Sequence, residues 1–278
     1  MNILKSFLPI GVFDSGIGGI TVLKSLAEKF PNENFIYLGD TARLPYGSKS
    51  QETISNYSIQ NIEYLFNRGV KAIVIACNSA SSHCPIDMYQ GIPIYNVITP
   101  GAKMAIQVTT KGRIGVLGTR ATINSLSYAN AIHRLMPEYL VFQQACPLFV
   151  PLAEEGLIHD EVTNIIATRY LKNLINENVD TIILGCTHYP ILKPTLQKIA
   201  PPEIKWVDSG QSMAQILEYE FLNHHLQSNL NENELSNRNI EVVTTDSSEQ
   251  FIKMAEFILS PISVNQFTMA HLAISNSN

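Results

Sequence analysis

Two cysteines, Cys77 and Cys186, occupy equivalent places in the chain. Residues 70–79 (VKAIVIACNS) align without a gap with residues 179–188 (VDTIILGCTH), at an offset of 186 minus 77, or 109 residues. Each thiol follows an apolar run typical of a buried strand and precedes a helix start, where backbone N–H groups and the helix dipole favour thiolate over thiol. We therefore expect both cysteines to serve as acid or base, and two thiols on opposite faces of a carbon atom could invert it in either direction.

Polar side chains follow both cysteines and could hydrogen-bond a carboxylate or an ammonium group. They are Asn78 and Ser79 after the first cysteine, and Thr187 and His188 after the second. Each thiol also needs a neighbour that adjusts its proton affinity, and the candidates are Asp14 for Cys77 and His188 for Cys186. Glu154, in the segment PLAEEG, is a third candidate that could face the same site.

The glycine-rich segment 14–19 (DSGIGG) does not fit a nucleotide-binding motif, because it lacks both the Gly-Lys-Ser/Thr of a phosphate loop and the spacing GxGxxG. A site for an anionic substrate is the simpler interpretation. Removing an α-proton from an amino acid leaves a carbanion, which fixed hydrogen-bond donors around the carboxylate can stabilise without a cofactor. The four cysteines include no CxxC pair, which disfavours zinc, so we expect neither a metal nor a cofactor.

Short β-branched runs alternate with amphipathic stretches, which is typical of parallel strands buried on both faces and covered by helices. The sequence predicts strands at residues 10–13, 34–38, 73–76, 114–117, 138–143 and 241–244, and one directly before the second cysteine. Helices are predicted at residues 20–30, 51–67, 162–174, 213–222 and 249–259. Ser48 and Gln51 predict a capping box for the second of these helices, and Val162 and Ile165 are expected on the apolar stripe of the third.

The order of elements begins again near residue 114, where IGVLGT echoes IGVFDS at residue 10, an offset of 114 minus 10, or 104 residues. We therefore predict two pseudosymmetric, doubly wound α/β domains with mainly parallel sheets. The first comprises residues 1–98 and a returning tail, 211–278; the second comprises residues 99–210. Because ligands bind beyond the carboxyl ends of parallel strands, the active site is expected in the cleft between the domains.

Composition excludes several classes of function. Apolar residues make up 45% and charged residues 15% of the 278, as in compact two-domain proteins. The formal net charge is −5 without a basic cluster, which argues against nucleic acid as the main partner. No apolar run approaches the roughly 20 residues of a membrane span, and residues 1–9 do not fit a signal peptide, so we expect no membrane partner and a cytoplasmic location.

Four segments resemble glutamate racemases of the aspartate/glutamate racemase superfamily: residues 14–19, 39–47 (GDTARLPYG), 76–81 (ACNSAS) and 184–190 (LGCTHYP). The resemblance runs through nearly the whole chain and implies Cys77 and Cys186 as the acid/base pair. The substrate contacts it implies are Asp14, Ser15, Pro45, Tyr46, Gly47, Asn78, Ser79, Thr187 and His188, with Thr119 and Thr122 as further positions. The family usually has threonine where this chain has Ser79, which keeps the hydroxyl but loses a methyl group that restricts its rotamer.

The same resemblance implies a small-molecule substrate, glutamate, and a bacterial enzyme that supplies D-glutamate for peptidoglycan synthesis. It also implies that the enzyme needs no metal or pyridoxal phosphate and forms a homodimer.

The residues alone leave other functions open. A two-domain protein could close on a small acidic ligand without chemistry, and a racemase of the same architecture could act on aspartate, a hydantoin or a dicarboxylate. A hydrolase could use Cys186 as nucleophile with His188 as base, although residues two apart at a strand end need not face each other.

Overall fold

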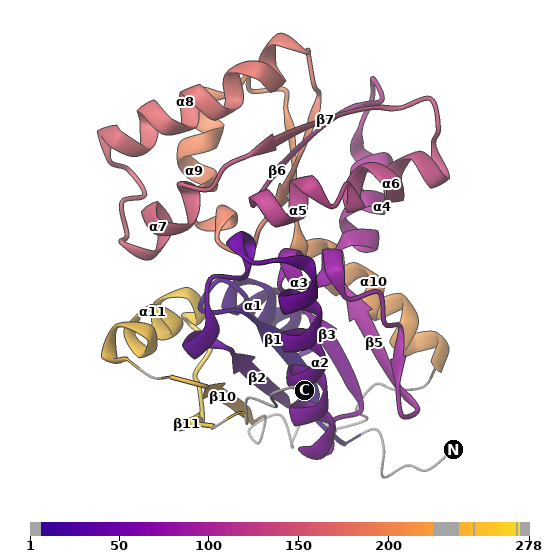
Figure 1. Ribbon diagram of the computed structural model, residues 1–278, viewed down its shortest axis with the longest axis vertical. Helices are drawn as coiled ribbons and strands as arrows, with labels where there is room; N and C mark the ends of the chain where they lie inside the picture. Colours follow the sequence, from indigo (N-terminus) through magenta and orange to yellow (C-terminus); the bar gives the residue numbers. More distant parts are fainter. Residues whose placement is uncertain (1–6, 225–238, 247, 271, 273–278) are drawn as a thin grey trace.

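The chain folds into two units of helices and sheet that lie one above the other (Figure 1). The computed structural model describes residues 7–224, 239–246, 248–270 and 272. The lower unit in Figure 1 is built on a seven-stranded sheet and the upper unit on a four-stranded sheet. We call them the first and the second unit. The predicted α/β class with mainly parallel sheets is confirmed.

Strand order in the first unit is β11-β10-β2-β1-β3-β5-β4, and every neighbouring pair is parallel except β4 with β5. These strands are β1 (Ile10–Asp14), β2 (Phe35–Gly39), β3 (Ala72–Ile75), β4 (Met88–Tyr89), β5 (Ile92–Asn96), β10 (Ile240–Thr244) and β11 (Gln266–Met269). The second unit has the all-parallel order β7-β6-β8-β9. Its strands are β6 (Arg113–Gly118), β7 (Leu140–Ala145), β8 (Thr181–Gly185) and β9 (Lys205–Asp208).

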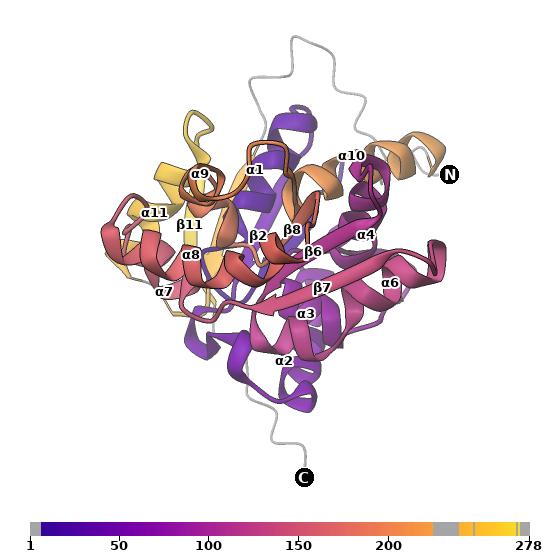
Figure 2. The same ribbon diagram turned by 90° about the horizontal axis from the view of Figure 1, so that it is seen from above.

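Helices cover both faces of each sheet, as Figure 2 shows from above. In the first unit, α1 (Ile20–Lys29), α10 (Ser209–His224) and α11 (Glu249–Leu259) cover one face, and α2 (Gln51–Asn67) and α3 (Asn78–His83) the other. In the second unit, α7 (Phe149–Glu154), α8 (Glu161–Asn176) and α9 (Tyr189–Ile199) face α4 (Ile98–Val108) and α6 (Ser127–Leu135) across the sheet, and α5 (Arg120–Asn124) follows β6. Because successive side chains of a strand point to opposite faces, Val12 joins one core and Phe13 the other.

The tail of the chain adds strands to the first sheet, since β10 pairs in parallel with β2 and β11 extends the edge. Helix α10 follows the last strand of the second unit in the sequence and covers one face of the first sheet. This connecting helix contacts both α1 and α4. The domain limits drawn at residues 98/99 and 210/211 stay a prediction, and part of the tail lies outside the described residues.

Two local predictions are wrong. Helix α2 is capped by Ser50, whose hydroxyl accepts a hydrogen bond from the Thr53 amide at 3.3 Å, so Ser48 and Gln51 form no capping box. On α8, Val162 and Ile165 are 54% and 59% exposed. The buried side of α8 is formed instead by Thr163, Ala167, Leu171 and Leu174. The helix is therefore rotated so that two of its apolar residues face water.

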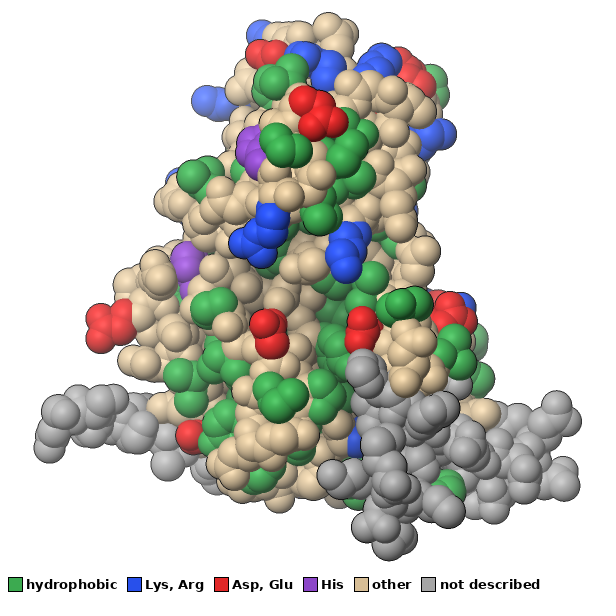
Figure 3. Space-filling view, turned by 90° about the vertical axis from the view of Figure 1, so that its right-hand side faces the viewer, with side chains coloured by type: hydrophobic (Ala, Val, Ile, Leu, Met, Phe, Trp, Pro, Cys, Tyr) green, Lys and Arg blue, Asp and Glu red, His purple; other side chains and the backbone are tan. Residues whose placement is uncertain are grey.

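The charge on the surface and the length of the apolar helices indicate whether nucleic acid or a membrane could be a partner. On the face that Figure 3 shows, acidic and basic side chains are interspersed among hydrophobic ones. Such a mixture gives a phosphate backbone little electrostatic attraction. No helix in the described part of the chain is long and apolar enough to cross a membrane.

Candidate active site

A cavity of about 140 Å³ lies where the carboxyl ends of strands from both sheets meet. Such a volume is below the roughly 300–1,000 Å³ of sites for drug-sized ligands, so the cavity suits a small metabolite. The predicted residues that line it are Ser15, Pro45, Tyr46, Gly47, Cys77, Asn78, Ser79, Thr119, Glu154, Cys186, Thr187 and His188. Two predicted residues, Asp14 and Thr122, lie behind the lining. The structure therefore brings sulfur atoms from the two units to one cavity.

Cys77 follows β3 and caps the N-terminus of α3. Its Sγ atom accepts a hydrogen bond from the Ala80 amide at 3.5 Å and lies 3.9 Å from the Ser15 hydroxyl. Burial nevertheless raises the pKa of the Cys77 thiol, and the negative charge of Asp14 raises it further. The expectation that this thiol is shifted toward thiolate is therefore wrong, because desolvation outweighs the backbone hydrogen bonds.

Cys186 follows β8, and its Sγ atom lies 3.9 Å from Nδ1 of His188. The other ring nitrogen of His188, Nε2, lies 2.9 Å from the Glu154 carboxylate. Burial opposes charge on this ring, but the contacts with Cys186 and Glu154 prevail and raise the pKa of His188 to about 10. A positively charged ring therefore sits between a sulfur atom and a carboxylate. The thiol of Cys186 and the imidazole of His188 thus face each other, as expected for the neighbour that adjusts the proton affinity of this thiol.

Asp14 ends β1 and is fully buried. Its carboxylate accepts hydrogen bonds from the Gly16 amide at 2.9 Å and from the Thr187 hydroxyl at 3.1 Å. Burial raises the pKa of Asp14 despite the nearby His188 and these two donors. Asp14 thus links the first unit to the cavity wall that the second unit provides.

A buried polar cluster, which sequence reasoning did not identify, holds the loop that carries Tyr46. The Tyr46 hydroxyl donates to Asp40, and Asn61 donates to the Tyr46 oxygen at 3.1 Å. Arg43 pairs with Asp40 at 2.7 Å and stacks 4.2 Å from the centre of the Tyr57 ring. The polar run GDTAR was the available signal, but its partner on α2 is distant in sequence.

Hydroxyl groups connect the two units on the other side of the cavity. The hydroxyl oxygens of Ser79 on α3 and Thr119 at the start of α5 lie 2.9 Å apart. The hydroxyl oxygen of Thr119 also lies 3.1 Å from that of Thr122. Thr122 is therefore one hydrogen bond behind the cavity lining. Gly47 packs so closely on Thr119 that an added Cβ atom would lie 2.8 Å from the Thr119 side chain.

Two further residues that sequence reasoning missed fix the amide of Asn78. Tyr128 donates to its oxygen at 2.6 Å, and its nitrogen donates to Ser209 at 3.1 Å. These partners come from α6 and from the start of α10. The amide orientation of Asn78 is therefore set by the second unit and the connecting helix.

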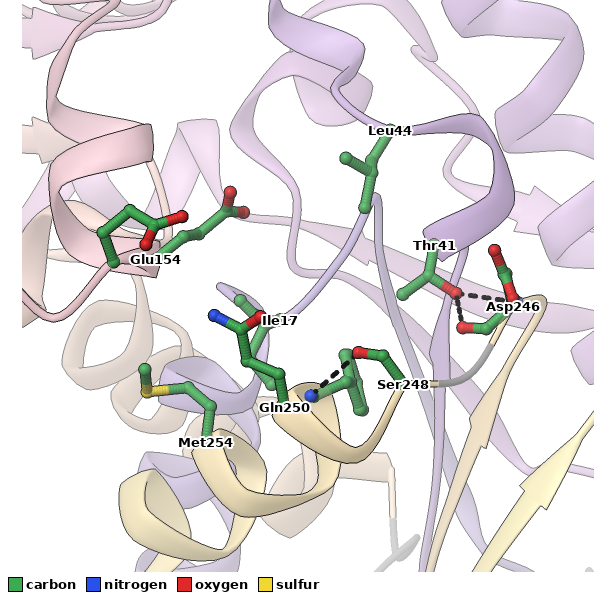
Figure 4. A pocket seen from close by; sticks show the side chains of 10 residues that line it. Ile17, Thr41, Leu44, Glu154, Asp246, Ser248, Gln250 and Met254 are labelled. Carbon is green, nitrogen blue, oxygen red and sulfur yellow. Dashed lines mark hydrogen bonds between the residues drawn. The ribbon is translucent and has the colours of Figure 1, made fainter.

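A second pocket, shown in Figure 4, adjoins the cavity and shares Leu44 and Glu154 with it. Three carboxylate residues line this pocket, and Figure 4 shows Glu154 and Asp246 on opposite sides of it. The third is Glu155. We call it the acidic pocket. In the described part of the chain, no group of three or more His, Cys, Asp or Glu residues is arranged to hold a metal ion.

Comparison with known proteins places this chain in a family. Residues 10–217 match the family model described as Asp/Glu/Hydantoin racemase. The chain is 50% identical to the glutamate racemase of Geobacter metallireducens over 211 residues, which cover 75% of this chain and 78% of that protein. It is 43% identical to the glutamate racemase of a Sulfurihydrogenibium species over 269 residues, covering 95% and 99%.

A solved structure agrees with these relatives. The glutamate racemase of Francisella tularensis, crystallised in complex with D-glutamate, is 35% identical and superposes with a TM-score of 0.88 over 96% of this chain and 98% of that one. The chain belongs to the Asp/Glu/hydantoin racemase family, and the prediction of an isomerase is confirmed. Within that family, the relatives just described are glutamate racemases, so the resemblance stated from four sequence segments is confirmed as well.

Proposed function

We propose that the chain racemises glutamate, with Cys77 and Cys186 exchanging the roles of base and acid on opposite faces of the α-carbon. The observation that carries this proposal is that both sulfurs, each following an equivalent strand of its own unit, line one small cavity. The named activity of relatives that match almost the whole chain supports glutamate as the substrate.

The polar lining supplies the groups that such a substrate needs. The hydroxyl and amide groups of Ser15, Asn78, Ser79 and Thr187 could hold the two carboxylates of glutamate. Donors fixed around the α-carboxylate would stabilise the carbanion that forms when the α-proton leaves. Asp14 would orient Thr187 through their 3.1 Å hydrogen bond. No step of this scheme requires a cofactor.

The two thiols begin in different states in this scheme. Burial raises the pKa of Cys77, which therefore begins with its proton in place. The scheme assigns the first proton acceptance to Cys186, whose Sγ atom lies 3.9 Å from Nδ1 of His188. Cys186 then takes the α-proton from one face, and Cys77 gives its own proton to the other face. One proton is removed and one is delivered, and the opposite enantiomer restores the starting state by the reverse transfer.

Incubation with L-glutamate in deuterated water tests the proposal. We expect D-glutamate to form with deuterium at the α-carbon, and Cys77→Ala and Cys186→Ala each to lower racemisation at least about 1,000-fold. Cys84→Ala is the matched control, because Cys84 is buried but does not line the cavity. Full activity in either site variant would reject the two-thiol scheme.

The same experiment addresses the rival functions. The contact between Cys186 and His188 is the specific observation that favours a thiol hydrolase. A hydrolase would cleave an amide or ester without exchange at the α-carbon, and a binding protein would leave glutamate unchanged. A preference for aspartate or a hydantoin would appear when these replace glutamate in the assay.

We further propose that the product supplies peptidoglycan synthesis in a bacterial cytoplasm and that the enzyme works as a homodimer. Deletion of the gene should make growth depend on added D-glutamate, and sedimentation should give twice the chain mass. Growth without D-glutamate, or a monomer at working concentration, would reject the respective statement.

A further inference from the structure

The cavity is short of positive charge for a substrate with two carboxylates. Among the described residues that line it, only Arg120 and His188 can carry a positive charge. His188 already faces the Glu154 carboxylate at 2.9 Å. Asp14 lies directly behind the lining and adds a second carboxylate. An anionic substrate therefore meets repulsion at the bottom of the site, and among the described lining residues Arg120 is the one cation without a described carboxylate partner that can offset it.

Arg120 stands at the mouth of the cavity. The exposed lining residues mark this mouth and the buried ones mark the floor. The mouth residues are Leu44, Pro45, Ser48, Arg120 and Pro151. Arg120 is the first residue of α5 and follows Thr119, whose hydroxyl bonds Ser79 within the wall. The guanidinium is thus carried on an anchored turn while its charge stays in contact with water.

The pocket that adjoins the cavity is acidic. The acidic pocket shares Glu154 and Leu44 with the cavity and is also lined by Glu155 and Asp246 (Figure 4). A molecule with net negative charge that arrives through the acidic pocket is repelled, whereas one that arrives beside Arg120 is attracted. Charges arranged in this way around a cleft raise the rate of productive encounter by about 10- to 1,000-fold.

We propose that Arg120 is the capture residue for the anionic substrate, attracting a carboxylate to the mouth and acting on substrate binding rather than on proton transfer. This inference rests on the proposed function, because it assumes a substrate with net negative charge. It assigns a specificity role to a residue that neither the repeat nor the four motif segments contain.

Steady-state kinetics of three variants test the inference. In Arg120→Gln we expect KM for both enantiomers to rise about tenfold at low ionic strength, with kcat within twofold of wild type. Arg120→Lys should keep most of the affinity, and Arg120→Glu should raise KM by about 100-fold. Arg134→Gln is the control, because Arg134 is exposed on α6 and does not line the cavity.

The dependence of kcat/KM on ionic strength distinguishes substrate capture by charge from a purely structural role of Arg120, which would not change that dependence. The kcat/KM of wild type should fall as salt rises from about 0.01 to 0.5 M, since screening shortens the reach of the charge, and Arg120→Gln should have a flatter dependence. If wild type racemises glutamate but Arg120→Gln keeps its KM and its salt dependence, the capture role alone is overturned. If wild type shows no racemisation of glutamate, the proposed function and this inference both fail.

Discussion

The Nε2 atom of His188 lies 2.9 Å from Oε1 of Glu154, so the carboxylate holds the ring nitrogen that points away from Cys186. Glu154 ends α7 and His188 precedes α9, and both helices belong to the second unit. The Glu154 side chain is 35% exposed and borders the acidic pocket as well (Figure 4). The charge of the ring that supports the Cys186 sulfur therefore depends on a carboxylate within reach of solvent.

Glu154→Gln should move the alkaline limb of the pH profile. The carboxylate helps to raise the pKa of His188 to about 10, so its loss lowers that pKa and the ring loses its proton at lower pH. In the proposed scheme the charged ring is needed, so the alkaline decline of kcat/KM should shift down by about one unit, which corresponds to roughly 1.4 kcal/mol. Kinetics between pH 6 and 10 measure the shift.

Glu155→Gln is the control for this prediction, because Glu155 is exposed and borders the acidic pocket without a described bond to His188. The control should keep the wild-type profile. An alkaline limb that stays in place in Glu154→Gln would contradict the dependence of His188 on this carboxylate.

The sequence was sufficient for features that recur locally along the chain. Residues 70–79 and 179–188 carry the same strand and the same cysteine, so the position of each thiol after a buried strand could be predicted before the fold was known. The strand pattern likewise predicts a doubly wound fold, because both faces of each sheet must be covered.

Other features depend on contacts between distant segments. The protonation of Cys77 follows from its burial beside Asp14, which no local pattern reports. The partner of Tyr46 on α2, Asn61, is fifteen positions away and meets it only in the folded chain. On α8, Val162 and Ile165 fit an apolar stripe, but packing buries the neighbouring side of that helix instead.

Tyr46→Phe should destabilise the protein. Its hydroxyl donates to Asp40 and accepts from Asn61 at 3.1 Å, and all three residues are buried. Removing the hydroxyl leaves a buried carboxylate oxygen and a buried amide each short of a partner, at a cost of about 1–3 kcal/mol in the free energy of unfolding. Urea denaturation measures the change. Tyr57→Phe is the control, since the Tyr57 hydroxyl has no hydrogen bond to any described residue, and equal losses in the two variants would contradict a role for the cluster.

Gly18→Ala should lower activity more than stability. A Cβ atom at Gly18 would lie 2.4 Å from the Thr187 hydroxyl and 2.5 Å from Nδ1 of His188, so both side chains must move. Displacements of about 1 Å near reacting groups lower rates by roughly 100-fold, and we expect kcat/KM to fall at least that far. The overpacking itself should cost about 1–3 kcal/mol of stability.

Gly69→Ala is the control that separates a loss of stability from a loss of activity in Gly18→Ala. Gly69 has a φ of +72° and open space around its Cα atom, so alanine there costs about 1–2 kcal/mol of backbone strain but touches nothing in the site. The Gly69→Ala variant should lose about as much stability as Gly18→Ala and keep the wild-type kcat/KM. If Gly18→Ala retained wild-type kcat/KM while losing the same stability, the close packing of Gly18 on Thr187 and His188 would have no part in holding the active site.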